Sequence, residues 1–401
     1  MKKILLALSA LFIVSACSDK NSLKNTERGR IDLERGFKNL ALFRLSEVAE
    51  DIEYVFLETN DNCLMNDVFR MVYSSPYFFI TDNRRKSIFI FDETGKHVNT
   101  LSAVGQGPEE YINIRSFDVH DNTVYILDSE QKKVLIYDIN GKCISTFRIE
   151  QWASLLKITD EGNVLLVTSN LWLNSNEGYV FSEYDRDFNL KRKFKQMEPT
   201  GSEVHWVAHA FYRQRGDLIY WEYNIFDTVY TVLPQGRAEA RFILDPGTVQ
   251  SAHIMKNQDA DGNVKSSEFE LARLIETDEY VFLFGVYDRE FATLLYSKNK
   301  NQTAGVERLT NNIDGGMPFW PYFKLTDNKV ADARFPYEIK KYLDKEPKEH
   351  HKDFNYLTHR IKMDYDAEKH RKLLESLEKT DDMSNPVLII ATIKSGVSHE
   401  K

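Results

Sequence analysis

Basic residues are fewer than acidic residues in this chain, which has 52 lysines and arginines against 61 aspartates and glutamates. Its net charge is −9. If residues 1–16 are removed, Lys2 and Lys3 go with them and the balance becomes two charges more negative. A nucleic-acid partner requires a basic surface. The charge balance therefore excludes a nucleic-acid-binding protein.

Cysteine is also scarce. The chain contains only Cys17, Cys63 and Cys143, which excludes a scaffold held together by many disulfides. An oxidising periplasm would permit a bridge between Cys63 and Cys143. The two residues fall in different predicted sheets, however, and this separation favours two buried free thiols.

Sequence signatures of catalysis are missing. There is no Gly-x-Ser-x-Gly nucleophile motif and no His-Glu-x-x-His metal motif. Four histidines gather near the C-terminus, but their spacing fits a solvated charged helix better than a metal site. His205 and His209 could act as ligands only with a third group that the sequence does not identify. We expect no metal and no cofactor, and we assign no catalytic residue.

Long apolar runs are absent except at the N-terminus. Lys2 and Lys3 precede the apolar stretch Ile4–Val14, which is too short to cross a bilayer as a permanent helix. Val14-Ser15-Ala16-Cys17 then resembles a bacterial lipobox. We expect residues 1–16 to be a signal peptide, Cys17 to be lipidated, and residues 17–45 to form a lipidated N-terminus and tether. The alternative is an ordinary secretory signal, with Cys17 incidental.

Aromatic residues are plentiful, with 20 tyrosines and 25 phenylalanines, and they favour β-structure. Tyr77–Leu101 aligns with Thr123–Phe147 at a shift of 46 residues. Each copy reads as three apolar runs separated by a polar turn and an Asp-x-x-Gly turn. In a partial third copy Phe188 replaces the turn glycine, so Asn189 is expected to take the left-handed conformation. A repeat of about 40–50 residues built from short strands is typical of a propeller blade.

The repeat predicts an all-β fold, a six-bladed β-propeller over residues 46–395. The segment 336–382 is highly charged with helical periodicity, which predicts a helical insertion in the last blade. Residues 386–393 return to a strand pattern. We therefore expect a strand from each terminus to share the last blade, because closing the ring removes exposed sheet edges. We expect a monomer.

Several short motifs carry a family resemblance. They are Leu57-Glu58-Thr59, Gly105–Tyr111, Asp227–Tyr230, Asp314–Gly316 and Asn385–Leu388. In this order they resemble the six-bladed β-propeller lipoproteins of Bacteroides-type bacteria, with NHL-like repeats. The resemblance implies a propeller with a helical insertion in its last blade, and it implies no activity.

A candidate binding site follows from the expected propeller. The starts of the innermost strands and the crossings before them ring one mouth of the central channel. The residues placed there are Arg115, Trp152, His205, Trp206, His209, Trp320 and Tyr322. Aromatic side chains with a few polar groups suit a peptide or glycan pocket. Packing between blades is the alternative role for each of these aromatic residues.

Three functions are consistent with the sequence. The first is a lipid-anchored, non-enzymatic propeller that binds a peptide, glycan or protein partner in the cell envelope. The second is an envelope hydrolase or lyase, which would need acidic or histidine side chains converging at the channel mouth. The third is a scaffold whose insertion docks a partner, which requires an exposed apolar stripe at Leu373, Leu374 and Leu377.

We predict that protease treatment of intact cells leaves the protein uncleaved. Residues 18–21 lack the dense acidic run associated with surface-exported lipoproteins, so we expect an outer-membrane anchor facing the periplasm. Immunoblotting before and after treatment, with lysed cells as the control, measures this. Cleavage on intact cells would place the protein on the surface instead.

Overall fold

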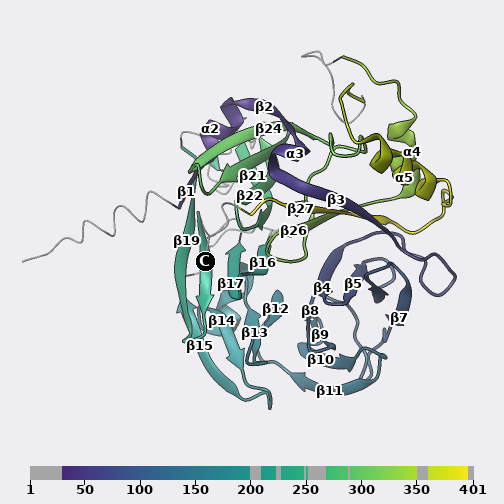
Figure 1. Ribbon diagram of the computed structural model, residues 1–401. Coiled ribbons are helices and arrows are strands. Elements are labelled where there is room, and N and C mark those ends of the chain that lie inside the picture. Colours follow the sequence, from purple (N-terminus) through teal and green to yellow (C-terminus); the bar gives the residue numbers. More distant parts are fainter. Residues whose placement is uncertain are drawn as a thin grey trace, which may run out of the picture.

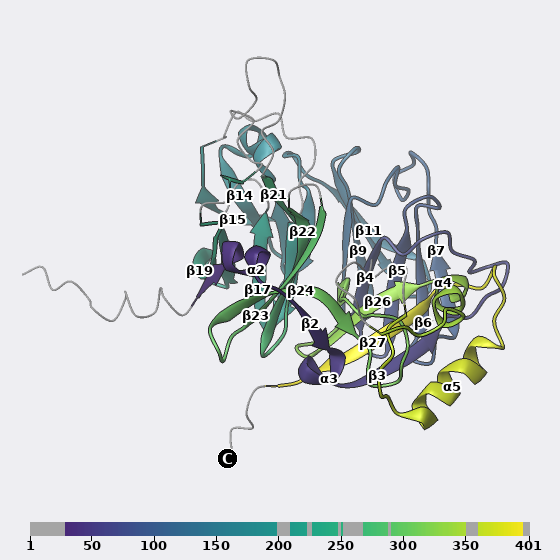
Figure 2. The same ribbon diagram turned by 90° about the horizontal axis from the view of Figure 1, so that it is seen from above.

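The computed structural model describes residues 29–198, 209–222, 227–247, 250–251, 268–287, 290–349 and 360–395. The fold is mainly β and propeller-like, with a few short helices. The described residues form six sheets, which Figures 1 and 2 show arranged around a common centre. This arrangement agrees with the expected propeller class.

The first three sheets each consist of four strands in an antiparallel meander. Their strands are β4 (Arg70–Ser74), β5 (Tyr77–Asp82), β6 (Ser87–Asp92) and β7 (His97–Leu101); β8 (Ser116–His120), β9 (Thr123–Asp128), β10 (Lys133–Asp138) and β11 (Cys143–Arg148); and β12 (Leu155–Ile158), β13 (Val164–Val167), β14 (Tyr179–Tyr184) and β15 (Leu190–Gln196). A 3₁₀ helix, η1 (Asn170–Asn176), connects β13 to β14.

The other three sheets repeat the meander and recruit additional segments. Their strands are β16 (His209–Gln214), β17 (Asp217–Glu222), β18 (Thr228–Leu233) and β19 (Arg237–Asp245), with β1 (Arg30–Asp32); β20 (Gln250–Ser251), β21 (Glu268–Glu276), β22 (Tyr280–Tyr287), β23 (Glu290–Ser297) and β24 (Gln302–Thr310), with β2 (Leu40–Arg44); and β25 (Phe323–Lys324), β26 (Lys329–Arg334), β27 (Val387–Ile393) and β3 (Ala49–Phe56).

The repeat in the sequence corresponds to the second to fourth strands of the first two sheets. Strands β6 and β10 are buried on both faces, because a neighbouring sheet covers each face. In the turn after β6, the Asp92 carboxylate accepts hydrogen bonds from the N–H groups of Thr94 (2.9 Å) and Lys96 (3.1 Å). Gly95 has φ +85°, and a Cβ there would lie 2.3 Å from the Phe56 carbonyl oxygen. The turn therefore requires glycine.

The third copy of that turn differs from its prediction. Phe188 itself takes the left-handed conformation, with φ 63°, rather than Asn189. The Phe188 ring stacks on Phe147 of the preceding sheet, with centroids 3.6 Å apart. We attribute the strained backbone to this contact, which the packing between sheets supplies.

Part of the expected tether is folded. Within 17–45, residues 30–44 form β1, α2 (Leu33–Lys38) and β2; β1 pairs in parallel with β19, and β2 with β24. Helix α2 approaches β24 so closely that a Cβ on Gly305 would lie 2.0 Å from the Gly36 carbonyl oxygen. The tether prediction was wrong for these residues, because the added strands cover edges that the meanders leave open.

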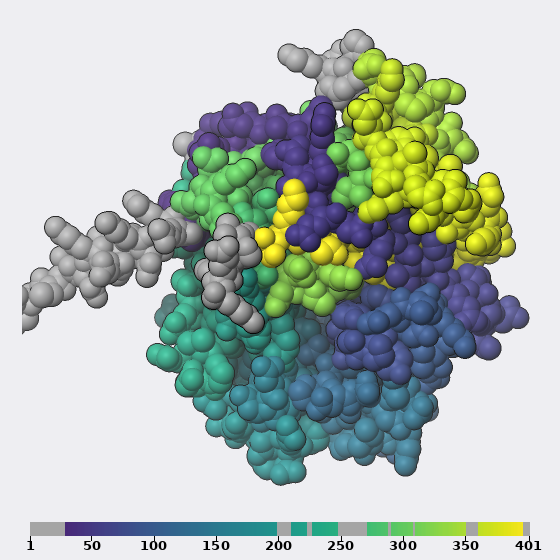
Figure 3. Space-filling model, in the orientation of Figure 1, coloured from purple at the N-terminus to yellow at the C-terminus, as the bar shows by residue number. Residues whose placement is uncertain are grey.

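The two ends of the chain meet in one sheet, as expected. Strand β27 pairs antiparallel with β3, from Val387 opposite Phe56 to Ile393 opposite Ala49. Helices α4 (Pro336–Leu343) and α5 (Ala367–Leu377) lie between β26 and β27 in the chain. A short helix, α3 (Leu45–Val48), precedes β3. Figure 3 shows the yellow C-terminal residues in contact with purple N-terminal residues.

Asn385 links these ends through its buried side chain. Its Nδ2 donates to the carbonyl oxygens of Glu58 (2.6 Å) and Cys63 (2.8 Å), and its Oδ1 accepts from the N–H of Met65 (2.8 Å). Two motifs more than 300 residues apart are thus joined directly. Cys63 is a buried free thiol, whereas the free thiol of Cys143 is only half-buried.

We predict that Asn385→Ala lowers the free energy of unfolding by about 2–4 kcal/mol, because it leaves buried backbone groups without hydrogen-bond partners. Urea unfolding followed by circular dichroism measures the change. Asn140→Ala, at an exposed turn position, is the matched control and should change stability by less than about 0.5 kcal/mol. Equal effects of the two substitutions would contradict a role for Asn385 in closure.

Candidate functional site

A central cavity lies where the six sheets meet. It has a volume of about 450 Å³ and is lined by residues of β4, β8, β12, β16, β21 and β25, so every sheet contributes to its wall. Strands β4 and β8 contact each other, as do β8 and β12, β16 and β21, β21 and β25, and β25 and β4. Figure 1 labels β4, β8, β12, β16 and β21 among these strands. The volume is within the range of small-molecule sites.

Three arginines gather at the end of the cavity where these strands begin. Arg70 is the first residue of β4, Arg115 immediately precedes β8, and Arg273 lies in β21. Arg70 and Arg273 line the cavity, as does Ser116, the neighbour of Arg115. We call Arg70, Arg115 and Arg273 the arginine cluster. They come from three different sheets, so only the packing of the sheets against one another brings them together.

The arginine cluster carries charge that the described residues do not neutralise. Arg70 Nε, Arg115 Nε and Arg273 Nη1 are buried and have no hydrogen-bond partner. Within the described ranges none of the three guanidinium groups forms an ion pair. Buried polar groups are almost always hydrogen-bonded, so three unsatisfied cationic groups around one cavity indicate a site for a ligand.

Aromatic rings lie next to each guanidinium group. The Cζ atoms of Arg70 and Arg115 lie 5.3 Å and 5.5 Å from the ring centroids of Phe69 and Trp172. Arg273 is the closest, with its Cζ 3.8 Å from the centroid of Tyr322. Cation–π contacts attract a cation without supplying a counter-charge. The rings therefore hold the guanidinium groups in place and leave their N–H groups available.

Burial and mutual repulsion act on the ionisation of the cluster. Burial, together with the charges of Arg115 and Arg273, lowers the pKa of Arg70 to about 10. Burial also lowers the pKa values of Arg115 and Arg273. A bound anion would favour the charged forms, because it supplies the missing opposite charge.

Further along the same strands, the cationic groups have hydrogen-bond partners. Lys157 Nζ donates to the Asp118 carboxylate at 2.7 Å. Burial lowers the pKa of Lys324 to about 8, and its ammonium donates to the carbonyl oxygens of Glu276 (2.7 Å) and Thr326 (2.9 Å). Arg273 and Glu276 are three residues apart on β21, or roughly 10 Å. These cations therefore differ from the arginine cluster, in which each guanidinium group keeps a buried nitrogen without a hydrogen-bond partner.

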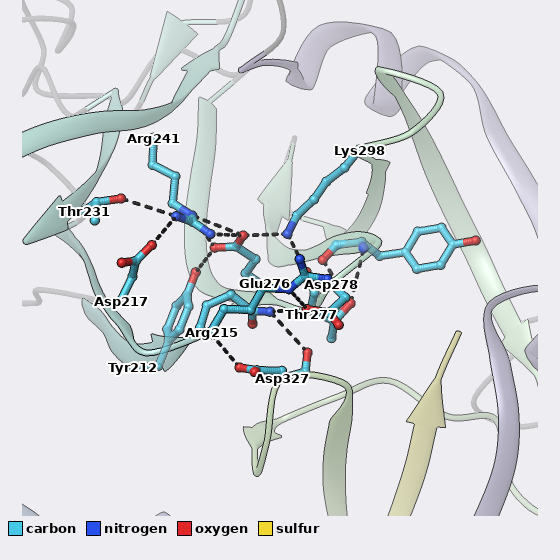
Figure 4. A network of polar contacts seen from close by, with 12 residues as sticks. Tyr212, Arg215, Asp217, Thr231, Arg241, Glu276, Thr277, Asp278, Lys298 and Asp327 are labelled. Carbon is cyan, nitrogen blue, oxygen red and sulfur yellow. Dashed lines mark hydrogen bonds and ion pairs between the residues drawn. The ribbon is translucent and has the colours of Figure 1, made fainter. Parts of the chain in front are cut away.

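Glu276 is the centre of the paired end. Its fully buried carboxylate accepts hydrogen bonds from Arg241 Nε (2.9 Å), Lys298 Nζ (2.5 Å) and the Tyr212 hydroxyl (3.3 Å). Figure 4 shows this network, which continues to Asp278 and Asp327. Arg241 and Tyr212 come from the sheet next to that of Glu276. The network therefore joins two sheets, and its groups satisfy one another.

The residues proposed from sequence lie in several places. Tyr322 lines the central cavity. Trp152 packs against Trp172 with centroids 5.6 Å apart, and Lys132 Nζ lies 4.7 Å from the Trp152 ring. Trp320 lines a separate pocket and packs edge-on against Phe282. Cys17, His205 and Trp206 are outside the described residues, as is the side chain of His209.

Sequence reasoning found Arg115 and missed Arg70 and Arg273. A signal existed, because Arg70 begins one innermost strand and Arg115 immediately precedes the next, 45 residues apart. The aligned repeat started at Tyr77 and so left out the innermost strands. Arg273 lies in a sheet with no readable repeat, and nothing in its local sequence distinguishes it.

A buried acid lies away from the cavity. Glu222 is the last residue of β17 and is fully buried. Burial raises its pKa to about 7, while the Tyr220 hydroxyl and the Asn170 N–H (3.2 Å) donate to its carboxylate. Glu222 does not line the central cavity. Asn170 belongs to η1, the same 3₁₀ helix whose Trp172 contacts Arg115.

Comparison with known families now identifies the chain. The model of a domain of unknown function, DUF4934, matches residues 28–392. The chain belongs to the DUF4934 family. A prokaryotic membrane lipoprotein lipid-attachment site matches residues 1–18. This DUF4934 protein is therefore a lipid-anchored exported protein of the cell envelope, and the expected lipoprotein class is confirmed. No helix within the described residues is long and apolar enough to cross a membrane.

A solved structure supports the fold of the DUF4934 protein. A Bacteroides fragilis protein described as exported aligns with a TM-score of 0.63 and 18% identity, over 88% of this chain and 99% of that chain. Two others align less well. A DUF4221-family member from Bacteroides vulgatus has a TM-score of 0.44 and 9% identity, over 86% and 97% of the two chains. Virginiamycin B lyase from Staphylococcus aureus has a TM-score of 0.37 and 9% identity, over 64% of this chain and 73% of that chain. Comparison with curated proteins gives no match.

We predict that Arg70→Met raises the free energy of unfolding by about 1–3 kcal/mol, because it removes a buried and uncompensated charge. The folded-state pKa of Arg70 lies below its unfolded value. The loss of stability caused by the charged Arg70 side chain is therefore fully present at pH 7, and it declines only as the pH rises above the folded pKa of about 10.

Urea unfolding at pH 7 measures this change. Arg241→Met is the matched control, since it leaves Glu276 with one cation fewer, and it should lower stability by about 2–4 kcal/mol. If both substitutions destabilise the protein equally, the charge of Arg70 is not uncompensated.

Proposed function

We propose that the DUF4934 protein is a non-enzymatic binding module that captures an anionic group of a peptide, glycan or protein partner in its central cavity. The arginine cluster carries this proposal. Arg70 and Arg273 line a cavity large enough for a ligand, Arg115 lies next to it, and each of the three has an unsatisfied guanidinium nitrogen. Arginine binds carboxylate, phosphate and sulfate through paired hydrogen bonds.

The proposed architecture places the site in the envelope. We propose a closed six-bladed propeller over residues 46–395, with 336–382 as a helical insertion in the last blade. Residues 1–16 would be the signal peptide and Cys17 the lipidated residue, holding a monomer at the outer membrane on its periplasmic face. Since the overall charge is negative, the cationic site is local rather than part of a basic surface.

The alternative, a hydrolase or lyase, has weaker support. It requires acids or histidines that converge on the cavity. Among the described lining residues the only carboxylate is that of Asp118, and it is paired with Lys157. Glu222 has a raised pKa but does not line the cavity. The geometry therefore favours binding over acid–base chemistry.

The scaffold alternative depends on exposed leucines in α5. Leu373 and Leu377 are each only 3% exposed and belong to the core cluster of the last sheet. Leu374 alone is partly exposed, at 39%. One exposed leucine does not form an apolar stripe. The insertion therefore packs on the sheets through these residues.

We predict that inorganic phosphate and citrate bind a soluble chain that begins at Ser18 and so omits the lipidated Cys17. Arg70→Met and Arg273→Met should each weaken binding by about 10- to 100-fold, since a hydrogen bond to a charged group is worth about 1.5–3 kcal/mol. Isothermal titration calorimetry at fixed ionic strength measures this. Arg70→Lys should lie between wild type and Arg70→Met, because it retains charge without the planar fork.

Arg84→Met is the matched control for net charge. Arg84 is exposed and lies outside the cavity lining, so its loss should change the dissociation constant by less than twofold. If Arg84→Met and Arg70→Met weaken binding alike, the effect is one of bulk charge. In that case, or if neither anion binds wild type, the proposed function is wrong.

A further inference from the structure

A second pocket adjoins the central cavity. It has a volume of about 400 Å³ and lies between strands β22, β23 and β24 and the segment leading into β25, with one residue each from β26 and α4. Its wall includes Phe284, Phe291, Met317, Pro318, Trp320 and Tyr322. We call it the aromatic pocket. Its size is sufficient for one or two aromatic rings.

The rings of the aromatic pocket are arranged with their faces available. Phe284 and Phe291 are stacked at 5.6 Å with an interplanar angle of 22°. Phe284 and Tyr322 are tilted at 6.0 Å. Phe291 is 66% exposed, which is unusual for a phenylalanine beside other aromatic rings. The exposed ring faces present an apolar surface that an aromatic group can cover.

Two charged side chains lie in this wall, those of Arg334 and Glu307, and the cationic one already has a partner. Arg334 lines the pocket, and its Nε donates to the Asp332 carboxylate at 2.8 Å. It therefore differs from the three arginines of the central cavity, whose charges lack counter-ions among the described residues. The two cavities have complementary characters, one cationic and one mainly apolar.

Tyr322 connects the two cavities. It belongs to the lining of both, with Arg273 3.8 Å from its ring centroid and Phe284 beyond. The two cavities therefore meet at the side chain of Tyr322. An anionic head and an apolar body in one molecule would match both cavities.

We propose that the aromatic pocket is a second subsite of the anion-binding site and that the ligand is an anion bearing an aromatic ring. This inference rests on the proposed function, because the arginine cluster supplies the anchor. The ligand class includes aromatic carboxylates, aryl phosphates and sulfates, and acidic peptides with an aromatic side chain. A purely polar anion occupies only the central cavity, and an uncharged aromatic compound lacks the anchor.

The test compares two probes with the same head group, inorganic phosphate and 2-naphthyl phosphate. Calorimetry on the soluble chain that begins at Ser18 should give about 30-fold tighter binding of 2-naphthyl phosphate, since burying an aromatic group contributes about 2 kcal/mol. Arg273→Met should weaken both probes to a similar extent. We call the ratio of the two affinities, 2-naphthyl phosphate over inorganic phosphate, the preference. Met317→Trp should fill the pocket and reduce this preference to about threefold, while the affinity for inorganic phosphate changes by less than twofold.

Two further variants test whether the change in preference comes from the pocket itself rather than from misfolding. Phe291→Ala removes an exposed ring, so the fold should tolerate it, and it should reduce the preference about fivefold. Ile144→Ala removes another exposed apolar side chain, 58% exposed on a different sheet, and should leave the preference unchanged. Circular dichroism confirms that each variant is folded.

The outcomes separate the two proposals. If Met317→Trp and Phe291→Ala keep the full preference for 2-naphthyl phosphate, the aromatic pocket is not the subsite, although anion binding stands. If Arg273→Met affects neither probe, the proposed function itself fails. Loss of the preference in the pocket variants, with phosphate binding intact, is the result we expect.

Discussion

The pairing of β27 with β3 is the constraint on which the whole structure depends. Each sheet has buried residues on both faces, as β6 and β10 show, and no four-stranded sheet can cover both of its own faces. The sheets must therefore pack side by side around a centre. Residues 49–56 and 387–393 complete the last sheet together, so the arrangement requires the entire chain.

Packing around a centre places the innermost strands around a cavity. Backbone groups and polar side chains that point inward must then find partners inside the protein. At one end they do, because Glu276, Arg241, Lys298 and Tyr212 satisfy one another across two sheets. At the other end the arginine cluster has aromatic neighbours but forms no ion pair among the described residues. The polar groups at one end are thus held by hydrogen bonds to one another, whereas guanidinium donors at the other end remain unsatisfied.

Uncompensated charge of this kind carries a thermodynamic cost. Burial depresses the pKa of Arg70, which means that the folded state disfavours the charged form that is present at neutral pH. Such a cost is usual at binding sites, where stability is exchanged for affinity. The aromatic pocket carries a similar cost in stability, because the apolar ring of Phe291 remains exposed to solvent beside other rings. Tyr322 lies where the two features meet.

Local sequence patterns were sufficient for much of the fold. The 46-residue shift between Tyr77–Leu101 and Thr123–Phe147 predicted the sheet unit, because turn aspartates and glycines have strict positional requirements. The strand pattern at 386–393 predicted closure. The N-terminal residues 30–44 were not predicted as strands, because their pairing with β19 and β24 depends on sheet edges that exist only after folding.

The candidate site was predictable only in part. Its general position followed from propeller geometry, and Arg115 and Tyr322 were named for that reason. The sequence by itself determined the sheet unit, the lipid-attachment signal and the sharing of one sheet by the two ends of the chain, because each depends on residues close together in the chain or on the pattern of the termini. The tertiary structure alone decided that Arg70, Arg115 and Arg273 share one cavity, because they come from three sheets and more than 200 residues of chain separate the first from the last.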